Sequence, residues 1–216
     1  MRYATMVLAF LSASALCSGT GRGADAVNSQ FFNGKNVEGW EGLSQYWSVK
    51  DGAIVGSTFP NGLRFNTFLC SKKKYTDFEL QFQVRMRGKG WDGNSGVQVP
   101  SKIRDSQTDR ENFAVEGPQC DMGQMYWGSL YGEHFGRGMM KAAPKDVVVR
   151  VLKKDDFNDY YIKCVGKHVT IKLNGETTVD GDFPELPDTG IIAWQIHQGG
   201  PMEVIFKDIK FKDLSK

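Results

Sequence analysis

The sequence predicts an all-β protein, a two-sheet antiparallel β-sandwich of the jelly-roll type. Three observations lead to this fold class. Short segments in which apolar and polar residues alternate recur along the chain, turn residues such as glycine separate these segments, and no long apolar repeat with a helical period is found. Because a strand with one apolar face has to bury that face, many such strands favour two sheets packed together.

The first strands form a predicted hairpin, followed by a long strand. Residues 46–50 and 53–57 read as short strands and flank Asp51-Gly52, a pair that favours a tight turn. Residues 77–87, DFELQFQVRMR, show the most regular alternation in the chain, with apolar side chains on one face and polar side chains on the other. This pattern is typical of an antiparallel strand with one buried face.

The second half of the chain predicts a meander and a long last strand. The strands of the meander are residues 160–165, 168–173 and 176–180. Asn174-Gly175, between the last two, is a preferred pair for a two-residue hairpin turn. In the last strand, residues 202–211, the apolar positions change phase, so we expect a β-bulge near residues 207–208.

Residues 89–143 differ from the rest of the chain. They are rich in glycine and polar side chains and show no sustained alternation. We therefore expect long loops and short strands here rather than core. Ordered loops on a rigid scaffold are where binding and catalytic residues usually lie.

The first 26 residues predict a signal peptide. A positive start is followed by an apolar run and by Ala24-Asp25-Ala26, which has the small-x-small form of a cleavage site. We expect the mature chain, residues 27–216, to be a single domain that is exported to the periplasm or secreted. Its later segments lack the roughly 20 apolar residues needed to span a bilayer, so no membrane contact is expected after cleavage.

Composition argues against several other classes of protein. The formal net charge is +2 at pH 7, which leaves no electrostatic footprint for nucleic acid. Cys70, Cys120 and Cys164 allow one disulfide at most and lack the paired spacing of a zinc site. Cys164 lies in an apolar strand pattern and is interpreted as a core residue.

Several segments together resemble one known family. They are FFNGKNVEGWEG (31–42), WSVKDGAIVGS (47–57), YTDFELQFQVRM (75–86), GNSGVQV (93–99), QCDMGQMYWGSLYGE (119–133), FNDYYIKCVGKHVTIKLNG (157–175) and GIIAWQIHQGGPMEVIFKDIKFKDL (190–214). In this order they are similar to the 3-keto-disaccharide hydrolase domain family. The resemblance covers nearly all of the mature chain and implies a fold like that of the concanavalin A-like lectins and glucanases.

The resemblance implies cleavage of glycosides whose glucosyl unit is already oxidised to a ketone at carbon 3. The ketone acidifies the proton on carbon 2, a base removes that proton, the enolate expels the glycosidic oxygen, and water adds to the double bond. Such a site needs a base matched to the operating pH and a group that holds the developing oxyanion. Two other functions stay open: a lectin-like module that binds carbohydrate without catalysis, and an ordinary glucan hydrolase. The sequence disfavours the hydrolase, because it has no paired acidic cluster on a strand.

Two pairs of polar residues are candidates for this site. In AWQIHQGG, Gln195 and His197 share the face of a strand opposite Trp194, and the resemblance places that face on the concave side of the sandwich. His197 is the preferred base, because imidazole titrates near neutral pH. Gln119 and Asp121 form a second pair with the same spacing, with Asp121 as a second catalytic candidate. Many relatives carry Glu-x-Gln there, so Gln-x-Asp is a departure from the family pattern.

Further candidates would contact the carbohydrate substrate. Asn94 could hydrogen-bond a sugar hydroxyl or simply shape a glycine turn. Trp91, Trp127 and Tyr131 could stack on a sugar ring, although burial in the core is the commoner fate of tryptophan. Arg137 could bind a carbonyl or carboxylate oxygen.

Three points concern the remaining histidines and a metal cofactor. His134 is interpreted as an exposed loop residue and His168 as a structural one. A divalent cation stays open as a cofactor, since His197, Asp121 and Glu116 offer suitable ligand types. No spacing such as HExxH fixes these three on one element.

Overall fold

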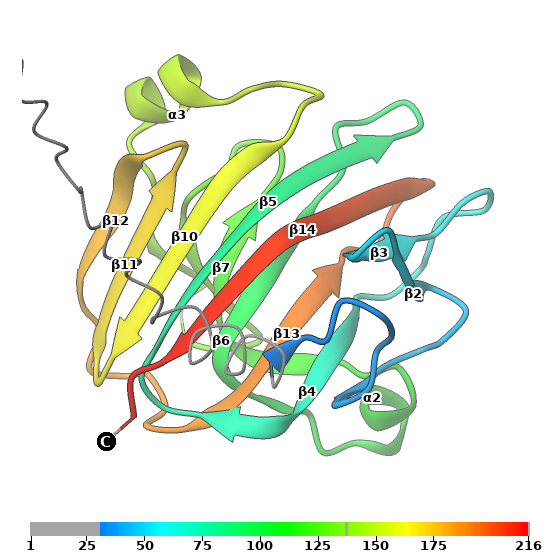
Figure 1. The fold of residues 1–216 in the computed structure, drawn as a ribbon, viewed down its shortest axis with the longest axis horizontal. Helices are drawn as coiled ribbons and strands as arrows, with labels where there is room; N and C mark the ends of the chain where they lie inside the picture. The colour runs from blue at the N-terminus through cyan, green and yellow to red at the C-terminus, as the bar shows by residue number, and fades with distance from the viewer. Residues whose placement is uncertain (1–30, 137, 216) are drawn as a thin grey trace, which may run out of the picture.

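The computed structural model describes residues 31–136 and 138–215, which form two antiparallel sheets packed face to face (Figure 1). Sheet A has the strand order β1 (Trp40–Glu41), β4 (Thr67–Tyr75), β13 (Gly190–Ile196), β6 (Ser95–Ile103), β7 (Val115–Met122), β8 (Leu130–Glu133) and β9 (Met139–Lys141). Sheet B has the order β12 (Glu176–Asp182), β11 (His168–Leu173), β10 (Asn158–Val165), β5 (Phe78–Gly88), β14 (Met202–Asp213), β3 (Ala53–Ser57) and β2 (Trp47–Lys50). The predicted β-sandwich is therefore confirmed.

Between residues 31 and 215, two short helices with described bounds accompany the sheets. They are α2 (Gln107–Glu111) and α3 (Lys145–Val151). In Figure 1, α3 lies at one end of the molecule beside β12, and α2 lies near β4 at the other. No helix in the described ranges is long and apolar enough to cross a membrane.

The core lies between the sheets and is rich in aromatic side chains. Trp194 of β13 is fully buried, with its ring centroid 5.2 Å from that of Phe82 and 4.6 Å from that of Phe206, both on sheet B. Trp40 and Trp47 are buried in the same cluster, and so is Cys164, which confirms the interpretation of Cys164 as a core residue. The two sheets are thus joined by continuous apolar packing, which is the main source of stability in a sandwich of this kind.

The predicted turns have the required backbone geometry. Asp51 and Gly52 have φ of 49° and 77°, and Asn174 and Gly175 have φ of 49° and 88°, as the two positions of a type I′ hairpin turn demand. The predicted bulge is also confirmed, because the pairing of β14 with β5 shifts between Lys207 and Lys210. These features are local, so their sequence signals are strong.

The prediction of loops rather than core for residues 89–143 is wrong at its centre. This segment contains β6 and β7, which pair with each other in the middle of sheet A and are almost wholly buried. Their core-facing residues alternate with residues that are buried on the other face of the sheet. Because both faces of these strands are buried, side chains on the two faces do not differ in solvent exposure. The sequence therefore lacks the polar–apolar alternation that marks a half-exposed strand.

The outer face of sheet A has an apolar part and a polar part. Phe68 and Cys70 of β4, Val115 of β7, and Ile191 and Ala193 of β13 form a second buried apolar cluster, away from the main core. Further along β13, the same face continues with a buried glutamine, Gln195. The candidate site lies where the apolar cluster ends.

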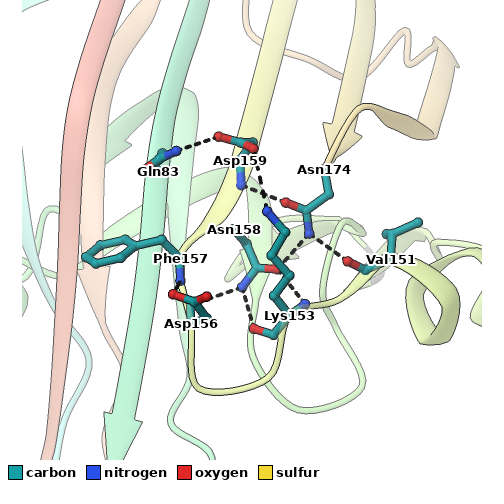
Figure 2. A network of polar contacts seen from close by, with 8 residues as sticks. All are labelled: Gln83, Val151, Lys153, Asp156, Phe157, Asn158, Asp159 and Asn174. Atoms are coloured by element: carbon teal, nitrogen blue, oxygen red, sulfur yellow. Dashed lines mark hydrogen bonds and ion pairs between the residues drawn. The ribbon is translucent and has the colours of Figure 1, made fainter.

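The loop between α3 and β10 is held by one buried asparagine (Figure 2). Asn158 donates through Nδ2 to the carbonyl oxygens of Lys153 (2.9 Å) and Asp156 (3.0 Å). Its Oδ1 accepts from the Lys153 backbone N–H (2.9 Å) and from Asn174 Nδ2 (2.7 Å). The hairpin turn at Asn174 and this loop therefore stabilise each other at the end of sheet B.

Candidate functional site

A polar cavity of about 250 Å³ opens on the outer face of sheet A. Its lining residues come from the ends of β4, β13, β6, β7 and β8 and from the adjoining loops. They are Asn66, Asn94, Gln119, Asp121, Tyr126, Tyr131, Glu133, His134 and His197. Five of these, Asn94, Gln119, Asp121, Tyr131 and His197, are residues that the sequence analysis placed in the substrate site.

Strand alternation explains how the two predicted pairs come to share one surface. Gln119 and Asp121 alternate with Cys120 and Met122, which lie in the core between the sheets. Their side chains therefore project from the outer face of sheet A. Gln195 projects from the same face because its neighbours Trp194 and Ile196 also lie in the core.

Buried amide groups connect the strands across this face. Gln119 Nε2 donates to Asp121 Oδ1 (2.6 Å) and to Gln195 Oε1 (3.2 Å), and the side-chain amides of Gln98 and Gln119 are hydrogen-bonded at 2.8 Å. Gly96 of β6 pairs with Asp121, and the Gln119 side chain passes directly over it. A Cβ atom at Gly96 would be 2.6 Å from Cγ and Cδ of Gln119, so only a glycine leaves this route open.

Asp121 is a buried carboxyl group, and its charged form is disfavoured. Burial raises its pKa to about 8, the hydrogen bond from Gln119 opposes this rise, and the nearby Glu133 adds to it. Loss of hydration penalises the ionised form, whereas a donor that points at it has the opposite effect. Near neutral pH, Asp121 therefore carries a proton and can donate it.

His197 follows β13 directly and is held by backbone groups. Its own N–H donates to the carbonyl oxygen of Asn94 (3.3 Å), and its ring Nδ1 is 2.6 Å from the carbonyl oxygen of Gln198. A carbonyl oxygen can only accept, so Nδ1 carries the proton. In the neutral ring the lone pair is then on Nε2, which can act as a base.

Glu133 and Asn66 line the cavity but were not among the predicted site residues. The Glu133 side chain is buried and accepts a hydrogen bond from Asn66 Nδ2 (2.8 Å), and its Oε1 is 3.6 Å from His134 Nε2. The spacing of Tyr131 and Glu133 on β8 repeats that of the two predicted pairs, a signal that could have identified Glu133. No sequence pattern identifies Asn66, which precedes β4.

The cavity region has unused hydrogen-bonding capacity and an aromatic wall. Within the described residues, Oδ1 of Asn94 and Nε2 of Gln195 are buried without a hydrogen-bond partner. Such groups are costly to bury unless a ligand or water satisfies them. Tyr126 and Tyr131 meet edge to face, with ring centroids 6.2 Å apart.

The other predicted contacts lie elsewhere or outside the described residues. Trp127 is buried in the main core and lines a separate cavity of about 80 Å³. Trp91 packs against Gly199 and Gly200 and donates through Nε1 to the carbonyl oxygen of Pro201 (3.3 Å). Neither tryptophan lines the larger cavity. Arg137 is not among the described residues.

A metal site was left open by the sequence. Across residues 31–136 and 138–215, no three His, Cys, Asp or Glu side chains are grouped so that they could hold a metal ion. Glu116, one of the three suggested ligands, is paired instead with Lys102 at 2.9 Å, outside the cavity lining.

The two packed seven-stranded sheets form a β-sandwich like that of the concanavalin A-like lectins. The chain belongs to the family of 3-keto-alpha-glucoside-1,2-lyase-like domains, whose sequence model matches residues 28–212. The resemblance seen in the sequence is therefore confirmed. None of the curated proteins compared with the chain matches it in sequence.

Solved structures share the fold at low sequence identity. A candidate glycosyl hydrolase from Parabacteroides distasonis ATCC 8503 has a TM-score of 0.61 and 22% identity, over 86% of this chain and 93% of that one. Carbohydrate binding module CBM66 from Bacillus subtilis has a TM-score of 0.56 and 12% identity, over 81% and 96% of the two chains. The VIP36 exoplasmic/lumenal domain has a TM-score of 0.59 and 10% identity, over 85% and 86%. These likenesses concern the fold.

Proposed function

We propose that this protein cleaves the glycosidic bond of 3-keto-glycosides by elimination and hydration. The observation that carries the proposal is the cavity on sheet A, where His197 and the buried carboxyl group of Asp121 lie together in a chain of the 3-keto-glucoside lyase-like family. A polar hollow of about 250 Å³ suits one sugar ring, with the second unit outside it.

His197 takes the part of the general base. Its Nε2 accepts the proton from carbon 2 of the 3-keto sugar, which is acidic because the neighbouring ketone delocalises the negative charge. A base that titrates near neutral pH combines the correct protonation state with adequate strength, so imidazole is well matched to this step.

Asp121 takes the part of the proton donor. In its neutral form it donates a hydrogen bond to the oxygen on which negative charge develops, as a buried neutral carboxylic acid can do in a site shielded from water. The enolate then expels the glycosidic oxygen from carbon 1, that oxygen takes up a proton, and water adds across carbons 1 and 2. Asn94, which lines the cavity, has a free Oδ1 with which to accept a hydrogen bond from a sugar hydroxyl.

A carbohydrate-binding module without catalysis is the second candidate function. It is favoured by the structural likeness to CBM66 and to VIP36, which was solved with a bound oligosaccharide. Such a module would use the same cavity but would not need a base beside a neutral carboxyl group.

One incubation separates the candidate functions. The purified protein is mixed with a 3-keto-disaccharide and, separately, with its unoxidised parent, and released monosaccharide is measured. We expect release from the ketone alone. Release from both substrates would indicate an ordinary hydrolase, and binding without release would indicate a binding module.

We also propose that the protein is exported. This rests on the sequence of residues 1–26, which lie outside the described structure. Fractionation of cells that express the full chain tests it: recovery of a shortened protein outside the cytoplasm is expected, and full-length protein in the cytoplasm would contradict it.

A further inference from the structure

The side chain of Asn66 joins two groups of the candidate site that are far apart in the sequence. Its Nδ2 donates to Glu133 Oε1 (2.8 Å), and its Oδ1 accepts from the backbone N–H of Gln198 (2.9 Å). Gln198 is the residue whose carbonyl oxygen receives the Nδ1 proton of His197. Asn66 therefore connects a buried carboxylate to the turn that holds the proposed base.

Only one orientation of the Asn66 amide satisfies both neighbours. A carboxylate oxygen accepts and cannot donate when ionised, whereas a backbone N–H donates and cannot accept. If the amide were rotated by half a turn, oxygen would face oxygen and N–H would face N–H. Asn66 thus fixes the directions of both hydrogen bonds.

Gln198 is held at both of its peptide groups by the segment that precedes β4. Asn66 holds the peptide before Gln198, and the Gly199 N–H, which belongs to the peptide after Gln198, donates to the carbonyl oxygen of Leu63 (2.8 Å). This backbone bond remains when the Asn66 side chain is removed. The turn therefore persists in such a variant, but Gln198 loses the restraint on its own N–H.

The Glu133 end of this link also bears on the proposed chemistry. Glu133 lines the same cavity as Asp121 and is one of the causes of the raised pKa of Asp121. The hydrogen bond from Asn66 holds the Glu133 carboxyl group at this place in the cavity.

We propose that Asn66 is a positioning residue for the two proton-transfer groups of the site, His197 and Asp121. It holds Gln198 so that His197 presents Nε2 as the basic nitrogen, and it holds the Glu133 carboxylate beside Asp121. The consequence for turnover rests on the proposed function; the consequence for the ring of His197 does not.

Two readouts test this role in the full chain. In ¹⁵N NMR, the wild-type His197 ring should show a protonated Nδ1 and a free Nε2, and Asn66→Ala should give a mixture of tautomers. With a 3-keto-disaccharide, Asn66→Ala should lower kcat about 10- to 100-fold, as is typical when an outer hydrogen-bond partner of a functional group is lost, and change KM little. Asn61→Ala, at an exposed asparagine in the same loop, is the matched control and should change neither readout.

A double substitution that exchanges donor and acceptor in the hydrogen bond between residues 66 and 133 gives a more specific test. Asn66→Asp keeps the acceptor for Gln198 but faces Glu133 with a like charge, so it should disturb the His197 ring at least as much as Asn66→Ala. Combining it with Glu133→Gln restores a donor and an acceptor with exchanged roles, and the wild-type tautomer should return. Unchanged ring shifts and a kcat within twofold of wild type in Asn66→Ala would overturn the proposal. If the wild type cleaves no 3-keto-disaccharide, the proposed function fails, while the ring shifts still decide the role of Asn66.

Discussion

Asp121 and His197 show how surroundings give two side chains complementary parts. Asp121 is 4% exposed, and burial raises its pKa to about 8, so it keeps a proton that an exposed aspartate would lose. His197 is half-buried, and the carbonyl oxygen of Gln198 determines which ring nitrogen carries the proton. A proton donor and a ring nitrogen with a free lone pair thereby line the same cavity.

The raised pKa of Asp121 predicts a dependence of stability on pH. Between pH 4 and 8 the folded chain keeps the proton of Asp121 while the unfolded chain loses it, so Asp121 makes the protein less stable as pH rises through this range. Asp121→Asn keeps the shape and cannot titrate. We expect the Tm of Asp121→Asn relative to wild type to increase steadily from pH 4 to pH 8. A difference in Tm that is constant with pH would show that Asp121 titrates normally.

Replacement of the proposed base predicts a selective loss of turnover. His197→Ala should lower kcat on a 3-keto-disaccharide by about 10²- to 10⁴-fold, the usual contribution of a general base. The matched control is His168→Gln on sheet B, where the ring lies between Asp180 and Asp182, away from the cavity. That variant should retain wild-type kcat. Full activity of His197→Ala would assign the base to another residue.

At the scale of the element, the central strands of sheet A determine the site. β6 lies between β13 and β7, and the missing side chain at Gly96 lets Gln119 reach across it to Gln195. The sheet thus connects its two polar pairs through buried hydrogen bonds. Removing one member of such a network leaves its neighbours without their partners.

An alanine at Gly96 should break this connection. The added Cβ would lie 2.6 Å from Gln119 Cγ and Cδ, so Gln119 has to move, and overpacking of this kind typically costs about 1–3 kcal/mol. We expect lower stability in urea by about this amount, and a lower kcat/KM because the displaced Gln119 side chain lines the cavity. Gly181→Ala on the edge strand β12, where the nearest atom is 4.0 Å away, is the matched control. Equal behaviour of the two variants would contradict this account of Gly96.

The strand β5 and the hairpin turns could be predicted from the sequence, whereas the central strands β6 and β7 were not predicted as core. The alternation of β5 and the turn at Asn174-Gly175 depend on local residues, and both were predicted correctly. β6 and β7 lie in the segment for which long loops and short strands were expected instead of core, because buried polar residues cover their outer face. The same burial that hides a strand in the sequence creates the polar site.

Part of the candidate site could be predicted, because strand alternation is visible in the sequence. Pairs of polar residues two positions apart, such as Gln119 and Asp121, stand out on one strand because they share a face. Asn66 reaches the site only through the tertiary fold, since its partners are 67 and 132 residues away. Trp127 shows the opposite case, as a residue of a polar segment that packs in the core.

At the scale of the whole molecule, the sandwich separates stability from chemistry. The aromatic core between the sheets holds the strands in place, and the outer face of sheet A carries the polar cavity. A broad range of sugar-related proteins can use such a scaffold, so function has to be argued from the residues of the cavity. For this chain, we propose that those residues remove a proton from carbon 2 of a 3-keto sugar.

Cleavage of a 3-keto-disaccharide in D₂O tests that step most directly. Elimination followed by hydration replaces the hydrogen on carbon 2 with one from solvent, so the 3-keto monosaccharide released early in the reaction should carry deuterium at carbon 2. Incubation of the same monosaccharide with heat-inactivated protein corrects for spontaneous exchange. Cleavage that leaves the original hydrogen on carbon 2 would contradict the elimination mechanism, and so would the absence of cleavage.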